Sequence, residues 1–334
     1  GFGDLAAYDL VIITTGAEWS EGEHAALQDY MSGGGGVLSA GHAWYWSYYN
    51  ENPAENHPGN KLLGDVGFVI SGSDGPSGDY GVGDVAPSKL QHASYALSAV
   101  LAHMDDSAPL SLEEQVIAAD TVGHAVGQLP LSFTAYWDRV LTFLAIAPPV
   151  VPTSDDPLVT AETPLDRLVV EIESKLAMEQ PPSELTAHPA AADFPGLPTE
   201  GATTISKTML IDGSYEGRSS YYAYSNPNAP VWRSTGLYVM AGTVASVTVP
   251  DHATDDGLSV LVGCHTDNLW HLESIERFPR ITRSFSIESE VTEIGSRFGG
   301  LVYVRVPGGV DVGTIEVTIE GAIEAPRYVH GVTT

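Results

Sequence analysis

The chain has 334 residues, 43% of them hydrophobic, so two or three domains with globular cores are expected. Asp and Glu outnumber Lys and Arg by 43 to 14, and the net charge of −29 argues against nucleic acid or anionic membranes as partners. A single cysteine excludes an internal disulfide, and no run of about 18 apolar residues is present to span a bilayer. The acidity suits a protein in a salty or extracellular setting but does not by itself fix the compartment; an extracellular or cell-surface location is the one we expect.

The first predicted domain, residues 1–108, opens with a strand, a helix and a second strand. Residues 8–16 and 36–41 are short continuous apolar runs, which is typical of buried parallel strands. Between them, Ser20 and Glu23 have the spacing of a helix capping box. The order predicts a parallel βαβ unit in an α/β domain. The N-terminal residues lack the basic region and cleavage pattern of a signal peptide, so none is expected there.

An acidic loop follows at residues 71–84. It contains Asp74, Asp79 and Asp84, which are weak candidates for calcium ligands. They lack the regular spacing of a calcium loop, so an acidic loop without a bound ion is preferred and calcium remains the alternative.

Two aromatic segments are candidate binding sites. Residues 42–50 read HAWYWSYYN, and residues 214–236 are rich in Tyr and Ser. If exposed at the C-terminal end of the sheet, the first segment could stack on a sugar or a peptide; we favour the alternative that it is buried against the helical segment. The binding candidates in these segments are Trp44, Trp46, Tyr48, Tyr221 and Tyr222.

Residues 109–202 are predicted to be a helical connector that ends in a Pro-rich linker. Helical patterns cover residues 111–147, starting at a capping box of Ser111 and Glu114, and a further helix starts near Pro164.

The last third, residues 203–334, is predicted to be all-β. Ile315, Val317 and Ile319 alternate with polar residues, so one face of this strand lies in a core and the other in water. Several similar runs with turns between them predict a β-sandwich.

The only cysteine, Cys264, stands beside His265, with Asp267 and His271 nearby. Zinc binds such residues, but consecutive residues of a strand point to opposite faces, so Cys264 and His265 could not both reach one ion without a turn. A catalytic cysteine is less favoured still. We expect Cys264 to be buried like a small apolar residue, and His265 and Asp267 to share a face and bond a turn.

Five segments in order resemble the start of the M60-like, enhancin-like peptidase domain, which also occurs in TRP channel-associated factors. They are WRSTGLYVMAGTVASVTVP, LVGCHTD, RFPRITRSFSI, SRFGGLVYVRVP and IEVTIEGAIEAPRYVHG. By this resemblance the segments belong to the β-sandwich that precedes the catalytic half. The residues given this structural role are Trp232, Arg233, Cys264, His265, Asp267, Arg277, Phe278, Pro279, Gly299 and Gly300.

The family's catalytic His-Glu-x-x-His motif is absent from the sequence. No catalytic residue can therefore be carried over, no cofactor is expected in this chain, and zinc is expected only in a catalytic domain outside it. Of the scarce arginines, Arg277, Arg280 and Arg283 are expected to pair with carboxylates; contact with acidic glycans is the alternative, which makes Arg280 a binding candidate.

Residues 33–46 and 56–68 resemble a class I glutamine amidotransferase-like domain of the flavodoxin-like α/β type. The active members carry a cysteine at the turn after a strand, and here that turn holds Ser39 and His42 instead. Amidotransfer through cysteine is thereby excluded. Ser39 and His42 remain weak candidates for a hydrolase site, because VLSAG supplies only half of a Gly-x-Ser-x-Gly elbow.

The resemblance implies the non-catalytic N-terminal region of a secreted M60-like metallopeptidase that acts on glycoproteins such as mucins, with a substrate-binding or scaffolding role. The alternative is an extracellular adhesion, assembly or structural subunit without enzymatic activity. Self-association would fit that alternative, because free β-edges can pair.

Overall fold

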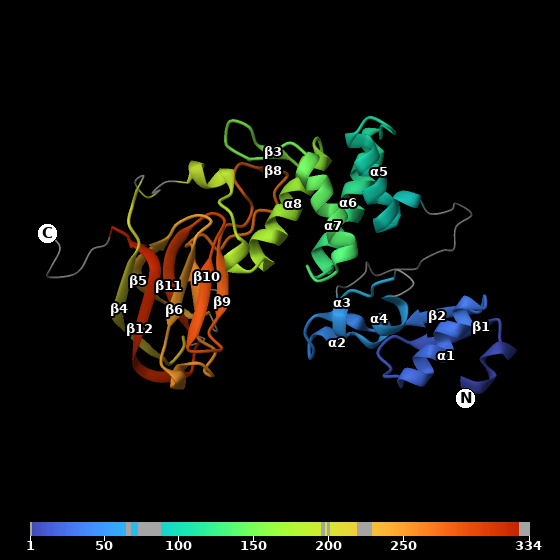
Figure 1. The fold of residues 1–334 in the computed structure, drawn as a ribbon, viewed down its shortest axis with the longest axis horizontal. Coiled ribbons are helices and arrows are strands. Elements are labelled where there is room, and N and C mark those ends of the chain that lie inside the picture. Colours follow the sequence, from blue (N-terminus) through green and yellow to red (C-terminus); the bar gives the residue numbers. More distant parts are fainter. Residues whose placement is uncertain are drawn as a thin grey trace. The chain divides into compact units, whose positions relative to one another are not determined.

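The computed structural model describes residues 2–64, 68–72, 88–194, 198, 201–218 and 229–326 (Figure 1). The chain forms two compact units. Unit 1 comprises residues 1–110 and 120–143, and unit 2 comprises residues 111–119 and 144–334. This division distributes the predicted helical connector over both units, while the predicted boundaries at residues 108 and 202 stay predictions.

The βαβ start of unit 1 is confirmed. Strands β1 (Leu10–Thr14) and β2 (Gly36–Ala40) pair in parallel, with helix α1 (Glu21–Ser32) between them in the chain. Ser20 and Glu23 form the predicted capping box. One face of the strand pair contributes Ile13 to a core with Leu27, while Leu10, Ile12 and Leu38 are 51–69% exposed on the other face.

Short helices follow β2, and longer ones come after them, with the last two divided between unit 1 and unit 2. They are α2 (Ala43–Ser47), α3 (Pro53–Asn56), α4 (Pro58–Leu63), α5 (Ala93–Met104), α6 (Leu112–Gln128) and α7 (Thr134–Ile146), with 3-10 turns at Phe2–Ala7 and Lys89–Gln91. The predicted helical stretch 111–147 is therefore two helices, separated at Pro130, and its Ser111–Glu114 capping box is present. The amidotransferase-like detail of this unit stays a prediction.

Unit 2 joins one long helix to an antiparallel β-structure. Helix α8 (Pro164–Glu179) begins at the predicted proline and buries Val170 and Ile172. A short pair, β3 (Leu158–Val159) with β8 (Ser274–Ile275), lies beside a core that includes Phe278 and Phe298. Further 3-10 turns lie at Pro182–Glu184, Pro189–Asp193 and Asp251–Ala253.

The predicted all-β character of the last third is confirmed. Its strands are β4 (Ile205–Tyr215), β5 (Val231–Val239), β6 (Val244–Thr248), β7 (Ser259–Val262), β9 (Arg283–Ser286), β10 (Val291–Gly295), β11 (Gly300–Val306) and β12 (Val310–Glu324). They form one antiparallel path, β10-β6-β12-β5-β11-β7-β9, with β4 on β12 (Figure 1). Two separate sheets were expected, but β12 pairs with both β6 and β5 and joins the layers.

A glycine lies where the pairing of β12 passes from β6 to β5. The register of β12 against β4 shifts between Glu320 and Ala322, and Gly321 between them has a φ of +84°. A side chain at Gly321 would place its Cβ 2.8 Å from the carbonyl oxygen of Val244. Val260, Val304 and Val317 are fully buried in the core between the strands. This core holds in place the strands that line the candidate site described below.

Candidate functional site

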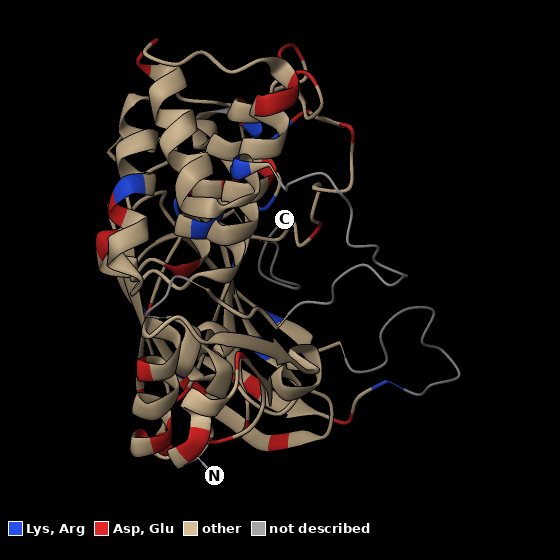
Figure 2. Cartoon of the chain, turned by 90° about the vertical axis from the view of Figure 1, so that its right-hand side faces the viewer, with Lys and Arg blue, Asp and Glu red and all other residues tan. Residues whose placement is uncertain are grey.

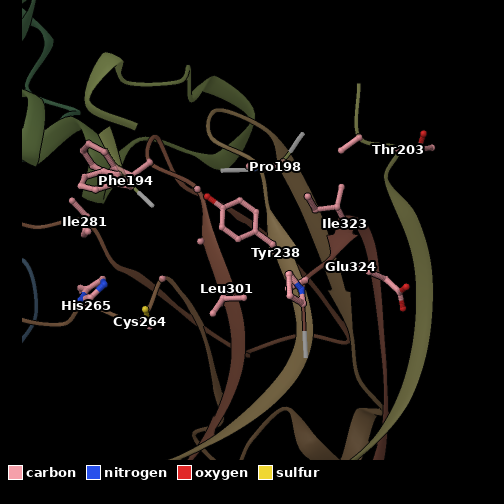
Figure 3. Close-up of a pocket in the computed structure, with 17 residues that line it drawn as sticks. Phe194, Pro198, Thr203, Tyr238, Cys264, His265, Ile281, Leu301, Ile323 and Glu324 are labelled. Atoms are coloured by element: carbon pink, nitrogen blue, oxygen red, sulfur yellow. The ribbon is translucent and has the colours of Figure 1, made fainter. Parts of the chain in front are cut away.

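A pocket of about 700 Å³ opens in unit 2 where several strands end. Its wall is largely apolar, and Figure 3 shows Phe194 and Ile281 toward one side and Ile323 and Glu324 toward the other, with Tyr238 between them. Burial raises the pKa of the Tyr238 phenol, so this group is a neutral hydrogen-bonding hydroxyl at physiological pH. The lining residues are Phe194, Pro198, Ala202, Thr203, Tyr238, Gly263, Cys264, His265, Ile281, Phe298, Gly299, Gly300, Leu301, Ile323, Glu324, Ala325 and Pro326.

Glycines shape one wall of this pocket. Gly263, directly after β7, has a φ of +98°, and its N–H donates to the carbonyl of Leu301 at 2.9 Å. A Cβ on Gly300 would lie 2.5 Å from the Gly263 nitrogen, and one on Gly299 would lie 2.7 Å from the Tyr238 hydroxyl oxygen. The absence of side chains at Gly299 and Gly300 therefore allows the neighbouring chain segments to approach closely here.

The expectation that Cys264 is buried is wrong. Gly263 ends β7 with a positive φ, and Cys264 and His265 follow as exposed residues that line the pocket. Asp267 does not bond a turn with His265; it forms an ion pair with Arg277. Within the described parts of the chain, no group of three or more His, Cys, Asp or Glu side chains could hold a metal ion.

The other signature residues make contacts within unit 2. Arg233 on β5 pairs with the Asp212 carboxylate at 2.7 Å, and the Trp232 ring lies 5.4 Å from that of Tyr303. Phe278 and Pro279 are buried, and the Arg277 Nη1 donates to the Phe278 carbonyl at 2.9 Å. The carboxylate pairing predicted for the arginines is therefore confirmed for Arg277.

Arg280 and Arg283 differ from each other. Arg280 is exposed, and its role as a glycan contact stays a prediction. Arg283 is buried, with its guanidinium 4.7 Å from the Phe285 ring centre and its Nη1 donating to the Ala177 carbonyl. Burial lowers the pKa of Arg283, and the nearby Glu179 carboxylate acts in the opposite direction.

A buried polar network behind the pocket was not found from the sequence. Glu173 on α8 accepts from the His188 Nε2–H at 3.0 Å, and its other oxygen lies 3.8 Å from Arg297 Nη2. The His188 Nδ1 accepts from the Ala190 N–H at 3.1 Å, which leaves Nε2 to donate to Glu173. The His188 ring packs on Phe298, which lines the pocket, at 5.2 Å between ring centres.

The structure does not form the nucleophile elbow considered for Ser39. Ser39 lies within β2, opposite Ile13 of β1, instead of at a turn between a strand and a helix. Its hydroxyl is buried and has no hydrogen-bond partner among the described residues. His42, at the start of α2, is exposed and lies 5.9 Å from the Trp44 ring. The weak hydrolase hypothesis is therefore not supported by the backbone at this position.

His57 is the fully buried histidine of unit 1. Its Nδ1 accepts from the Gly59 N–H at 3.1 Å at the start of α4, and the Trp46 ring packs on it at 5.1 Å. Burial lowers the pKa of His57 below its usual 6.5, so the ring is neutral at physiological pH.

The preferred burial of the aromatic segment is wrong for four of its rings. Trp44 is 39% exposed, and Tyr45, Tyr48 and Tyr49 are 54–76% exposed. Trp46 is partly buried and packs on His57, and its role as a binding residue stays a prediction. The remaining candidates, Tyr221, Tyr222, Asp74, Asp79 and Asp84, lie outside the described residues.

Two family models match the chain. Residues 215–320, which include much of the pocket wall, match the N-terminal domain of M60-like peptidases. Residues 7–85 match a family described as TRPM8, N-terminal domain. The M60-like part of the resemblance seen in the sequence is thereby confirmed.

Curated relatives match nearly the whole chain. A TRPM8 channel-associated factor homolog of Danio rerio is 26% identical over 94% of this chain and 34% of its own length. TRPM8 channel-associated factor 2 of Homo sapiens is 29% identical over 94% of this chain and 33% of its own length. TRPM8 channel-associated factor 3 of Rattus norvegicus reaches 42% identity, over 33% of this chain and 12% of its own length. The chain thus spans about a third of the first two relatives.

Among solved structures, an IMPa metallopeptidase in complex with T-antigen aligns with 94% of this chain and 37% of its own, at 16% identity and a TM-score of 0.38. The IMPa metallopeptidase from Pseudomonas aeruginosa covers 96% and 38%, at 13% identity and a TM-score of 0.33. Scores this low carry no argument about this chain. No helix in the described residues is long and apolar enough to cross a membrane.

Proposed function

We propose that this chain is a non-catalytic recognition region of an M60-like protein and that it binds a glycoprotein without cleaving it. The observation that carries the proposal is that residues 215–320 match the N-terminal domain of M60-like peptidases, in a sequence without His-Glu-x-x-His. Glycoproteins are the substrate class implied by the family resemblance. The expected extracellular or cell-surface location belongs to the same proposal.

The pocket in the matched domain is the binding site in this proposal. Apolar side chains such as Leu301 and Phe298 suit the CH face of a sugar or an apolar peptide side chain. The Tyr238 hydroxyl, the His265 ring and the Glu324 carboxylate add hydrogen-bonding groups at its wall. These groups can orient a ligand.

Cys264 provides a direct test, because it is the only cysteine, is exposed and lines the pocket. The probe is a mucin-type O-glycopeptide, with the same peptide lacking sugar as its control. We expect the glycopeptide to slow alkylation of Cys264 by N-ethylmaleimide. Cys264→Trp should abolish glycopeptide binding in calorimetry by filling the pocket mouth, whereas Cys264→Ser should retain it. Equal binding by both variants would rule out the pocket as the site.

A second candidate function is association with a membrane channel. It is supported by the names of the relatives, which are TRPM8 channel-associated factors and match 94% of this chain. Co-precipitation of the tagged chain with the channel from detergent-solubilised cells tests it. Capture that survives enzymatic removal of glycans would favour this candidate over glycoprotein recognition through sugar; no capture would remove it.

A further inference from the structure

Helix α2 and the residues after it expose an aromatic surface in unit 1. We call Trp44, Tyr45, Tyr48 and Tyr49 the aromatic surface, and their side chains are 39–76% exposed. Two tyrosines exposed above 70% at consecutive positions are unusual, because large aromatic side chains normally contribute their area to a core or an interface. A cluster of this kind marks an interaction site.

The rings are held in a defined arrangement. Trp44 contacts Tyr48, and Tyr45 contacts Tyr49, each pair four residues apart, with ring centres 5.8 and 5.3 Å apart. Trp46 anchors the segment to unit 1, because the centre of its ring lies 5.1 Å from that of the buried His57. The exposed rings therefore belong to an ordered element of unit 1, and their exposure is not a consequence of an unfolded segment.

The sequence around these rings carries more negative than positive charge, and the first cationic residue after them is Lys61 on α4. Residues 1–60 contain eight Asp and Glu and no Lys or Arg. Glu51 follows Tyr49 by two residues and is exposed, as is Glu55 on α3. Figure 2 shows acidic residues on many elements of the chain and few Lys or Arg. Charge complementarity thus favours a cationic ligand and disfavours an anionic one.

We propose that the aromatic surface binds a basic peptide segment through cation–π contacts, with its arginine or lysine side chains on the rings of Trp44, Tyr48 and Tyr49. The ring pairs meet at 69–84°, so they form corners. A corner can take a cationic head on one ring face and its aliphatic stem against the next ring, whereas a sugar stacks best on a flat plate. Unit 1 already contains such a contact, with the Lys89 Nζ 5.8 Å from the Tyr95 ring centre.

This site is separate from the unit 2 pocket and does not depend on the proposed function. The test uses a short fluorescent peptide with three arginines spaced by glycines, and the same peptide with neutral citrulline at each arginine. We expect the arginine peptide to bind more tightly in fluorescence anisotropy. Each ring removed should weaken binding about two- to fivefold, so Trp44→Ala/Tyr48→Ala/Tyr49→Ala should weaken it roughly tenfold or more.

Two controls separate ring contacts from the general attraction of an acidic chain. Tyr8→Ala removes another exposed aromatic side chain of unit 1 and should leave the affinity unchanged. Tyr48→Phe keeps the ring and should also bind normally. Circular dichroism checks that wild type and the triple variant are both folded. If both then bind the arginine peptide equally, the net charge of the chain alone explains the binding, and the proposal is overturned. It would also be overturned if the rings responded to a neutral O-glycan and not to the peptide.

Discussion

Substitution of Glu173 tests whether the buried network behind the pocket stabilises unit 2. The Glu173 carboxylate lies 3.0 Å from the His188 Nε2 and 3.8 Å from the Arg297 Nη2. The three side chains are 13%, 1% and 12% exposed, so water screens these interactions weakly. Burial lowers the pKa of Arg297, and the Glu173 carboxylate acts in the opposite direction, as expected for a cation that needs this counter-charge.

The size of the effect follows from these distances. At 3.8 Å, with an effective dielectric constant of about 20, the Glu173–Arg297 attraction is about 4 kcal/mol, part of which offsets the desolvation of both groups. Glu173→Gln keeps an acceptor for His188 and removes only the charge, so it should lower the free energy of unfolding by about 2–3 kcal/mol. Glu173→Ala also removes the acceptor and should lower it by about 3–5 kcal/mol.

The assay is urea denaturation followed by circular dichroism, with the m-value checked for constancy. Glu171→Gln is the matched control, because it removes the Glu171–Arg167 ion pair from the same helix, where the side chains are 22% and 37% exposed. It should cost no more than about 0.5 kcal/mol. If Glu173→Gln costs no more than this control, the buried network does not stabilise unit 2 and the reasoning is refuted.

Other predictions concern pH, capping and charge. Because burial holds the pKa of His57 below 6.5, the unfolded state gains its proton first as pH falls, and the melting temperature should drop below about pH 6.5. His57→Asn, whose amide oxygen can accept the Gly59 N–H, should flatten that slope. Ser20→Ala breaks the capping box with Glu23 and should lower the free energy of unfolding by about 1 kcal/mol in urea denaturation. A sialylated glycopeptide should bind more weakly than its neutral form in calorimetry, with the difference shrinking in about 1 M salt.

Local patterns were sufficient to predict several elements of the fold, although not the helices α2 to α5. The apolar runs and the Ser20–Glu23 spacing predicted the βαβ start, because a parallel strand and a capped helix each have a recognisable pattern within a few residues. The predicted burial of both strand faces was wrong, because Leu10, Ile12 and Leu38 are exposed on one of them. The alternation through Ile315 and Val317 predicted a half-buried strand for the same reason. The joining role of β12 was not predictable, because it depends on distant strands pairing with consecutive stretches near its C-terminal end, β6 with residues 318–320 and β5 with residues 323–324.

The candidate site was much less predictable than the fold. Phe194, Tyr238, Cys264, Leu301 and Ile323 come from separate stretches of the chain, and no local spacing signals that they meet. Cys264 was misjudged because a free cysteine usually packs as a small buried apolar residue, whereas Gly263 ends β7 and Cys264 after it is exposed. A glycine directly before the cysteine was the available signal.

The acidity of the chain links the two proposed sites. A net charge of −29 repels anions over distances of about 8–10 Å at physiological salt, so it disfavours sialylated or phosphorylated groups wherever they approach. The pocket in unit 2 meets this constraint with an apolar wall and the hydroxyl of Tyr238, which suit a neutral sugar or an apolar side chain. The aromatic surface of unit 1 meets it differently, because exposed ring faces beside carboxylates attract cations. A partner that carries neutral glycans and a basic segment would satisfy both surfaces, and an acidic partner would satisfy neither.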